Sequence, residues 1–332
     1  MRDPITLFER AFAELLRVSY AVAVCSGTGG LLAALLALEP RTGAEIVVGA
    51  YGWPQLVAAV RALGLGVRFV DSDMSGRLTA AAVQRALTPS CLAVVVCHLF
   101  GNPSEARLIR RIGDQTGVAV LEDCSQALLA RQGGLPVGTW GHIGFASIGR
   151  DKLLSGTEGG VVWTNDHTLY RRLFALTQHP HRAGDGRLAR ECLVRSLSLR
   201  MHPCAATEGL QELKRLAKRV ASVSAAHEKL RVLLQGAPGI RLPEVLADAV
   251  PAWSHFVFCS DCRLSHGTGD LLADTRPAYL LAERPEFANA VRFDASAHFI
   301  DSGRSWEHVS DQALGRIAGR ITQAASQTRA GD

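Results

Sequence analysis

The strongest constraint on the fold is a regular alternation of short apolar runs and helix-like segments along the first two-thirds of the chain. The run Leu92–Cys97 is apolar at every position, which indicates a strand that is buried on both faces. Helix-like segments separate such runs, and one of them, Pro54–Leu63, opens with proline in its first turn. Strands that alternate with helices form a largely parallel sheet covered by helices. The sequence therefore predicts an α/β fold.

The pattern also divides the chain. Strands are expected at 21–24, 45–48, 66–70, 92–97, 118–121, 142–147 and 160–164. Helices are expected at 28–38, 54–63, 79–87, 103–116, 166–177 and 205–234, with a polar loop at 178–190. Gly236-Ala-Pro-Gly239 interrupts the last helix, so we place a large domain at 1–235 and a small domain at 236–332. Within the small domain, strands are expected at 239–242 and 253–259, followed by a helix at 310–325.

Composition excludes several classes of protein. A chain of 332 residues that is 48% hydrophobic and 20% charged is neither disordered nor fibrous. The net charge of +5 is mild and the basic residues are scattered, so no nucleic-acid partner is expected. No apolar run approaches the length of a bilayer span, and residues 1–10 lack the apolar stretch of a secretory signal. We therefore expect no membrane partner and a cytoplasmic location.

The eight cysteines do not indicate a metal site. Cys259-Ser-Asp-Cys262 is a CxxC pair, but no second pair of ligands follows at a suitable spacing. Cys91, Cys97 and Cys124 lie in apolar runs, where cysteine behaves as a small core residue. We expect reduced thiols and no metal.

Three segments carry residues suited to chemistry. Cys25-Ser26-Gly27-Thr28-Gly29-Gly30 follows a strand and opens a helix, where free N–H groups and the helix dipole suit a phosphate. A plain strand-to-helix turn, which also needs glycine, is the competing interpretation. The segment is neither a GxGxxG fingerprint nor a Walker A loop.

The second segment ends an apolar strand with Glu122-Asp123, where doubly wound sheets bind their ligands. Asp123 suits a cationic ring nitrogen or a metal, although an exposed loop acid or helix cap would look the same. In the third segment, Lys152 lies in a loop of small residues and suits a Schiff-base nucleophile. A solvated lysine is the alternative there.

A phosphate turn, a later aspartate and then Ser147-x4-Lys152 follow one another in the order used by pyridoxal-phosphate enzymes. The sequence resembles the DegT/DnrJ/EryC1/StrS aminotransferases, the sugar-aminotransferase branch of the fold type I, aspartate aminotransferase-like enzymes. The resemblance spans about residues 5–235 and rests on these pieces: Ser26-Gly27-Thr28, Tyr51-Gly52-Trp53, Phe69-Val70-Asp71, His98-Leu99-Phe100-Gly101, Glu122 to Gln126, Gly138 to Gly141, Ser147 to Lys152, and Glu158 to Asp166. It implies a mostly parallel central sheet with a smaller, shortened C-terminal α+β domain.

The resemblance also implies roles at the site, with pyridoxal 5′-phosphate as cofactor. Lys152 would hold the cofactor as a Schiff base and later move a proton, and Asp123 would pair with the pyridinium nitrogen. Trp53 would stack on the ring. The remaining expected contacts are the phosphate partners Gly27, Thr28 and Ser147, and Gln126 near the ring hydroxyl.

Further expectations concern the partner subunit and the substrate. The resemblance implies a homodimer in which the segment 178–201 crosses to the other subunit, with Ser198 at the position of the usual asparagine. Ser198 is shorter than asparagine, but its hydroxyl can also donate a hydrogen bond to the partner's phosphate. The chain after Trp253 is short, and Ile148-Gly149-Arg150 replaces bulkier residues beside Lys152. We therefore expect an acceptor smaller than a full nucleotide sugar, or one presented by a carrier.

Arg182 is a candidate anchor for the anion of that acceptor, with a solvated loop charge as the alternative. The expected reaction is transfer of an amino group from an amino acid, glutamate or glutamine, to a keto or aldehyde intermediate such as a ketosugar or cyclitol. Two alternatives stay open. One is elimination or replacement chemistry with the same cofactor, against which the retained Lys152 weighs. The other is a degenerate, non-catalytic partner subunit.

Overall fold

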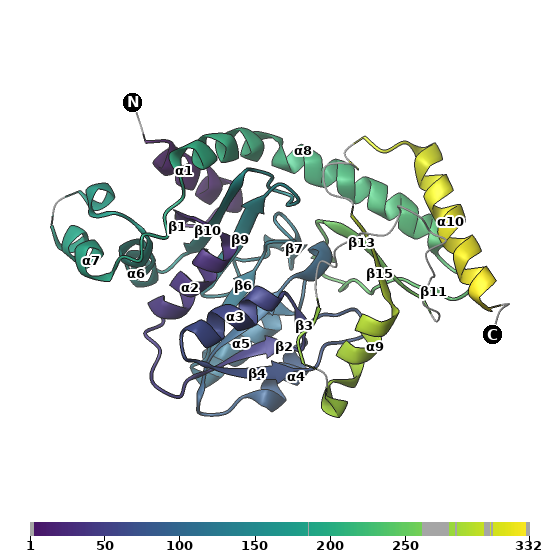
Figure 1. Cartoon of the computed structure of the whole chain (residues 1–332), viewed down its shortest axis with the longest axis horizontal. Coiled ribbons are helices and arrows are strands. Elements are labelled where there is room, and N and C mark those ends of the chain that lie inside the picture. Colours follow the sequence, from purple (N-terminus) through teal and green to yellow (C-terminus); the bar gives the residue numbers. More distant parts are fainter. Residues whose placement is uncertain are drawn as a thin grey trace.

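A seven-stranded sheet forms the centre of the molecule in a computed structural model, which describes residues 3–184, 186–260, 279–282, 284–301, 306 and 308–329 (Figure 1). The strand order is β1-β10-β9-β6-β5-β2-β4. The strands are β1 (Tyr20–Val24), β2 (Glu45–Gly49), β4 (Gly66–Val70), β5 (Cys91–Cys97), β6 (Ala119–Asp123), β9 (Ile143–Gly149) and β10 (Glu158–Thr164). The five strands from β9 to β4 are parallel to one another, whereas β10 is antiparallel to both of its neighbours, β1 and β9. The predicted α/β fold with a mostly parallel sheet is confirmed.

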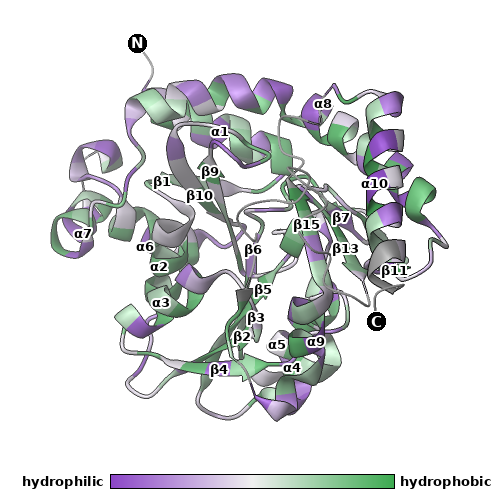
Figure 2. Ribbon diagram, turned by 45° about the vertical axis from the view of Figure 1, so that its right-hand side comes forward, coloured by the Kyte–Doolittle hydropathy of each residue, from purple (hydrophilic) through white to green (hydrophobic). Residues whose placement is uncertain are grey.

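Both faces of this sheet are buried under helices. Alternate residues of β5 show why its run is apolar throughout, because Val95 packs on one face and Val94 on the other. One face is covered by α2 (Gly27–Ala37), α3 (Pro54–Ala62) and α6 (His167–Thr177). The other is covered by α1 (Pro4–Leu16) and α8 (Pro203–Leu234) at one end and by α4 (Ala80–Ala86) and α5 (Ala106–Thr116) at the other. Figure 2 shows the central strands as mostly hydrophobic.

The long helix α8 links this body to a second, smaller sheet (Figure 1). That sheet has the order β11-β13-β15, from Ile240–Arg241, His255–Ser260 and Ala297–Asp301. The second half of α8 packs with it and with α10 (Asp311–Arg329) in a core of its own. The helix α9 (Ala288–Ser296) packs beside the same sheet and against Tyr51 and Phe100.

Two short strands return to the large body. The pair β12 (Ala249–Val250) and β7 (Arg131–Gln132) is antiparallel, and β7 also pairs with β8 (Leu135–Pro136). Farther along, β14 (Tyr279–Leu280) pairs with β3 (Tyr51–Gly52). Because strands on both sides of residue 236 share these sheets, the division into 1–235 and 236–332 stays a prediction.

The prediction of a loop at 178–190 is partly wrong. A short 3₁₀ turn at Pro180–Ala183 is followed by the helix α7 (Arg187–Arg195), which begins after Gly186 (φ 105°). Glu191 accepts from Arg187 at 2.9 Å and pairs with Arg171 of α6 at 3.0 Å, so charge pairs stabilise this helix and connect it to α6. Two further 3₁₀ turns cover Leu99–Gly101 and Pro285–Phe287. No helix in the described ranges combines the length and apolarity that a membrane crossing requires.

Candidate active site

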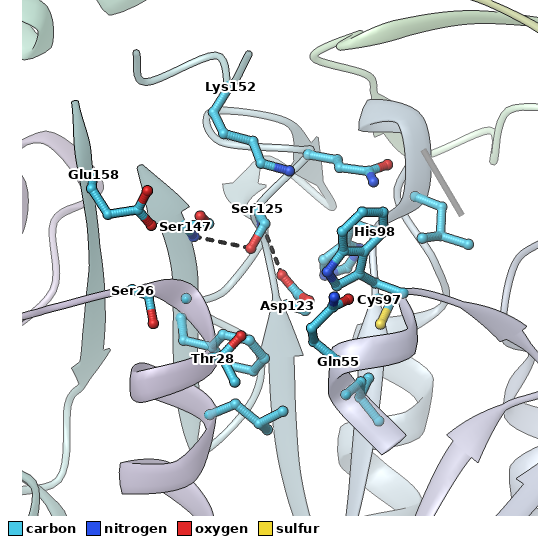
Figure 3. Close-up of a pocket in the computed structure, with 17 residues that line it drawn as sticks. Ser26, Thr28, Gln55, Cys97, His98, Asp123, Ser125, Ser147, Lys152 and Glu158 are labelled. Carbon is cyan, nitrogen blue, oxygen red and sulfur yellow. Dashed lines mark hydrogen bonds between the residues drawn. The ribbon is translucent and has the colours of Figure 1, made fainter. Parts of the chain in front are cut away.

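A cavity of about 190 Å³ opens at the carboxyl ends of β5 and β6, beside the N-terminus of α2 (Figure 3). This edge of a doubly wound sheet is where such folds bind ligands. It brings together seven residues that the sequence predicts for the site, namely Gly27, Thr28, Trp53, Asp123, Gln126, Ser147 and Lys152. Figure 3 shows Lys152 entering from one side, Asp123 from the strand ends and Thr28 from the helix.

The N-terminus of α2 forms one end of the cavity. Ser26 caps the helix, since its Oγ accepts from the Gly29 N–H at 3.0 Å and its carbonyl accepts from the Gly30 N–H at 3.0 Å. The N–H groups of Gly27 and Thr28 belong to the first turn, whose N–H groups have no intrahelical acceptor. This end of the cavity is therefore suited to an anion such as a phosphate.

Asp123 is the last residue of β6, and its carboxylate is oriented by the chain that follows. Its Oδ1 accepts from the Ser125 N–H at 2.9 Å, and Ser125 Oγ accepts from the Ser147 N–H at 3.0 Å (Figure 3). Two hydrogen bonds thus connect the acid to β9 across the cavity floor. Burial, and then the Asp123 charge, raise the pKa of the neighbouring Cys97 thiol, which stays protonated.

Lys152 lies in the turn after β9, with its N–H bonded to the Gly149 carbonyl at 3.1 Å. Its Nζ is 5.8 Å from the ring centroid of Trp53, so amine and indole face each other at the cavity mouth. Burial, together with the Lys152 charge, lowers the pKa of His255 to about 4. The imidazole near this amine is therefore neutral at physiological pH.

Gln126 supports the turn that borders the cavity on the β5 side. Its Oε1 accepts from the Phe100 N–H at 2.7 Å, which holds Phe100 at a φ of 63°. The next residue is Gly101, where an added Cβ would lie 2.0 Å from the Ala252 carbonyl oxygen. Only glycine lets the segment around Ala252 approach this closely, so the turn joins the cavity to the later part of the chain.

The structure places two predicted residues away from the cavity. Ser198 is exposed, with a φ of 52°, and its N–H donates to Ser196 Oγ at 3.1 Å. Arg182 forms an ion pair with the buried Glu9 of α1 at 2.7 Å. Within this chain, the guanidinium therefore connects α1 to the turn after α6 and does not line the cavity.

Sequence reasoning gave no role to several residues that line the cavity: Ser26, Gln55, His98, Ser125 and Glu158. Four of these five lie inside the motifs named in the sequence analysis, so membership of a motif is the sequence signal that could have identified them. Gln55 stands outside every motif, at the start of α3.

No metal cluster accompanies the cavity. Among the described residues, no group of three or more His, Cys, Asp or Glu side chains is arranged to hold a metal ion. Cys259 is buried in β13, and Cys262 lies outside the described residues.

The residues present fit pyridoxal 5′-phosphate. The N-terminus of α2 can bind the phosphate. The Asp123 carboxylate can pair with the pyridinium nitrogen, and the Lys152 amine can react with the aldehyde. The space for a phosphate depends on Gly27, because a Cβ there would lie 2.8 Å from Ser147 Cβ. An anion site, an acid, an amine and an indole thus surround one cavity.

Comparison with known proteins gives the same result. The sequence model of the DegT/DnrJ/EryC1/StrS aminotransferase family matches residues 3–283. The GDP-perosamine synthase of Escherichia coli O157:H7 is 36% identical over 169 residues, which are 51% of this chain and 46% of that protein. The L-glutamine:2-deoxy-scyllo-inosose aminotransferase of Streptomyces kanamyceticus is 33% identical over 185 residues, covering 55% of this chain and 42% of that protein. The chain thus spans about half the length of the curated relatives it matches.

Among solved structures, an aminotransferase from Psychrobacter cryohalolentis superposes with a TM-score of 0.87 at 23% identity. The alignment covers 98% of this chain and 92% of that one, and it shows that the two share a fold. The family model extends the match through the whole cavity, from the Ser26 turn to Lys152 and beyond. The chain belongs to the DegT/DnrJ/EryC1/StrS aminotransferase family, whose members depend on pyridoxal 5′-phosphate.

Proposed function

We propose that the chain is a pyridoxal-phosphate-dependent aminotransferase that moves an amino group from an amino acid to a keto or aldehyde intermediate, such as a ketosugar or cyclitol. One observation carries the proposal. The Lys152 amine, the Asp123 carboxylate and the N-terminus of α2 line the same cavity.

Each residue of the cavity then has a defined task. When bound, the cofactor supplies an aldehyde that takes up amines and a pyridinium ring that withdraws electrons from them. The Gly27 and Thr28 N–H groups bind its phosphate at the positive end of α2. Asp123 would keep the ring nitrogen protonated, because a carboxylate beside that nitrogen favours its charged form.

Lys152 has two tasks in succession. Its Nζ would hold the cofactor through the aldehyde, with loss of water, and once released by an incoming amine the same Nζ would serve as the base and acid that carries the substrate proton. Trp53, whose ring centroid lies 5.8 Å from Lys152 Nζ, would stack on the cofactor ring. Because His255 is neutral, it adds no positive charge beside Lys152.

The names of the relatives guide the choice of substrate. One is named for a glutamine donor and a cyclitol acceptor, and another for the synthesis of a GDP-linked amino sugar. For this chain we propose glutamine or glutamate as donor. The acceptor is a ketosugar, cyclitol or related carbonyl compound, and the sequence favours one smaller than a full nucleotide sugar.

We propose further that the chain works as a homodimer. The helix α7 projects from the body in Figure 1, and the segment around it exposes three large apolar side chains. The exposed fractions are 72% for Leu193, 86% for Val194 and 54% for Leu197. A two-fold interface would cover this surface in both copies and bring the segment that contains Ser198 to the partner's cavity.

The test is to bind the cofactor and locate it. Protein incubated with pyridoxal 5′-phosphate should show the absorbance of a protonated Schiff base, and borohydride reduction should fix the label on Lys152, as read by peptide mass spectrometry. Glutamine or glutamate should then convert the absorbance to that of the pyridoxamine form. Lys152→Ala should lose both signals, whereas Lys218→Ala, which changes an exposed lysine of α8, should keep them. Labelling at another lysine would overturn the proposal.

A further inference from the structure

A buried acid lies directly before Asp123 in β6. Glu122 is completely buried, and three N–H groups surround its carboxylate. Its Oε2 accepts from His98 Nε2 at 2.9 Å and from the Gly138 N–H at 2.7 Å, while Oε1 accepts from the Gly141 N–H. Several donors can stabilise a carboxylate that burial would otherwise disfavour.

The ring of His98 is held on both sides. Its Nδ1 accepts from the Ser104 N–H at 3.1 Å, so the ring proton resides on Nε2 and is donated to Glu122. The side chain of His98 is also fully buried. Ser104 in turn donates its hydroxyl to the Cys97 carbonyl at 2.8 Å, which fixes the same strand end.

This network is connected to Asp123 through the backbone. Strands β5 and β6 are in register, with Cys97 opposite Asp123, and the His98 N–H donates to the Asp123 carbonyl at 3.1 Å. Successive side chains of a strand point to opposite faces. Glu122 therefore holds the end of β6 from one face, while the Asp123 carboxylate projects from the other toward Ser125.

The contact between Glu122 and Gly141 has a strict spatial requirement. A Cβ at Gly141 would lie 2.8 Å from the Val120 carbonyl oxygen and 3.2 Å from Glu122 Oε1. Glycine thus allows the 138–141 segment to bring its N–H groups to the acid. The acid therefore connects three parts of the chain at the residue before Asp123.

We propose that the buried Glu122–His98 pair is a positioning element that sets the Asp123 carboxylate against the ring nitrogen of the cofactor, through the backbone of β6. The proposal rests on the proposed function, because it concerns the cofactor partner in that reaction. Glu122 and His98 act through Asp123 and are positioning residues, not catalytic ones.

A double-mutant cycle tests this coupling. Glu122→Gln places an amide where three donors converge, so the end of β6 shifts and kcat should fall about tenfold to a hundredfold, the cost of a small misplacement at a reacting centre. The KM for the amino donor should change little. In the Asp123→Asn background the same substitution should cost less than about threefold, because the group it positions is already gone. Equal losses in both backgrounds would overturn the proposal.

A matched pair of His98 variants tests which hydrogen bond of the imidazole matters, the one to Glu122 or the one from Ser104. Glutamine places an N–H near the position of His98 Nε2 and keeps the donor to Glu122, whereas asparagine places an oxygen near Nδ1 and keeps the acceptor for Ser104. We expect His98→Gln to retain several times more kcat than His98→Asn. Equal or reversed activities would show that Glu122 is not the relevant partner. These variants also answer the question if Glu122→Gln does not fold.

A spectroscopic readout separates this proposal from the proposed function. The pH midpoint of the bound cofactor's absorbance should shift in Glu122→Gln and in His98→Asn, and both shifts should vanish in the Asp123→Asn background. A parent protein without that absorbance would refute the proposed function itself. A parent that transaminates while Glu122→Gln leaves both kcat and midpoint unchanged would refute the positioning role alone.

Discussion

Gly27 lies so close to Ser147 that a Cβ atom added to the glycine would stand 2.8 Å from the Cβ of the serine. The first turn of α2 and strand β9 therefore meet without space for a methyl group. Since contacts below 3.0 Å do not occur between real Cβ atoms, one of the two elements would have to move.

Gly27→Ala should consequently weaken cofactor binding. The alanine would displace either the helix N–H groups or Ser147, both of which face the proposed phosphate. We expect the dissociation constant of pyridoxal 5′-phosphate to rise about tenfold or more, equivalent to roughly 1.4 kcal/mol, as measured by absorbance titration. Gly315→Ala in α10 is the control, because nothing lies within 4 Å of its added Cβ. An unchanged dissociation constant in Gly27→Ala would place the phosphate elsewhere.

Asp123→Asn should keep the fold and slow the reaction. A neutral amide no longer favours the protonated ring nitrogen, so proton removal from the substrate should slow by roughly a hundredfold or more. Single-turnover kinetics with the donor measures that step directly. Asp114→Asn, which changes an exposed acid paired with Arg110, should retain the parent rate. Transamination at the parent rate by Asp123→Asn would make this acid an ordinary loop carboxylate.

His255 should make stability depend on pH. Its folded-state pKa is about 4, below the ordinary value of 6.5, because of burial and then the charge of Lys152. The unfolded chain therefore binds more protons than the folded chain between these values, so the free energy of unfolding should fall as pH drops from about 6.5 to 4. Denaturant unfolding of the parent and of His255→Gln measures the difference, with a shallower slope expected in the variant.

The same histidine reports on Lys152. Removing the amine in Lys152→Ala takes away a cationic neighbour, so the pKa of His255 should rise from about 4 while burial keeps it below 6.5. An NMR titration of the imidazole carbon-bound protons measures this shift. A pKa that does not move would mean that the two side chains are electrostatically independent.

Arg182 should matter for stability rather than for binding a substrate. Arg182→Leu leaves the buried Glu9 carboxylate without its partner, which should cost about 3–5 kcal/mol of unfolding free energy. Arg187→Ala breaks an ion pair whose arginine is 82% exposed and should change that energy by less than about 0.5 kcal/mol. If Arg182→Leu instead raises KM for the acceptor at unchanged stability, the anion-anchor role would return.

Val194→Asp should disrupt the proposed homodimer. A charge on the apolar surface of α7, where Val194 is 86% exposed, would be buried in each copy of a two-fold interface. Sedimentation velocity at micromolar concentration should show monomers, with activity lost in parallel. Val232→Asp changes an exposed valine of α8 and is the matched control. A dimer that survives Val194→Asp would move the interface away from α7.

Seven of the residues that line the cavity were predictable because residues suited to chemistry coincide with strand ends and a helix start in the sequence. Leu92–Cys97 is apolar at every position, so its end was easy to place, and Asp123 stands at the end of the next strand. The glycines beside Ser26 marked the helix start in the same way. These signals depend only on neighbouring residues of the chain, so they can be recognised in the sequence.

What the sequence missed depends on distant partners. The sequence offered Arg182 as an anion anchor or a solvated loop charge, and it could not show the ion pair with Glu9 because that partner lies far away in the chain. The predicted loop at 178–190 also missed the start of the helix α7, which an ion pair between Glu191 and Arg171 connects to α6. Two-residue strands such as β12 are too short to show a period at all. In each case, tertiary contacts decide the structure.

The antiparallel pairing of β1 with β10 sets the order in which the molecule can be assembled on the ribosome. Tyr20 pairs with Thr164, so the first strand has no place in the sheet until β10 has been synthesised. Closure of such a long loop is entropically costly and slow. A nascent chain halted before β10 would therefore expose an apolar strand and be a target for chaperones.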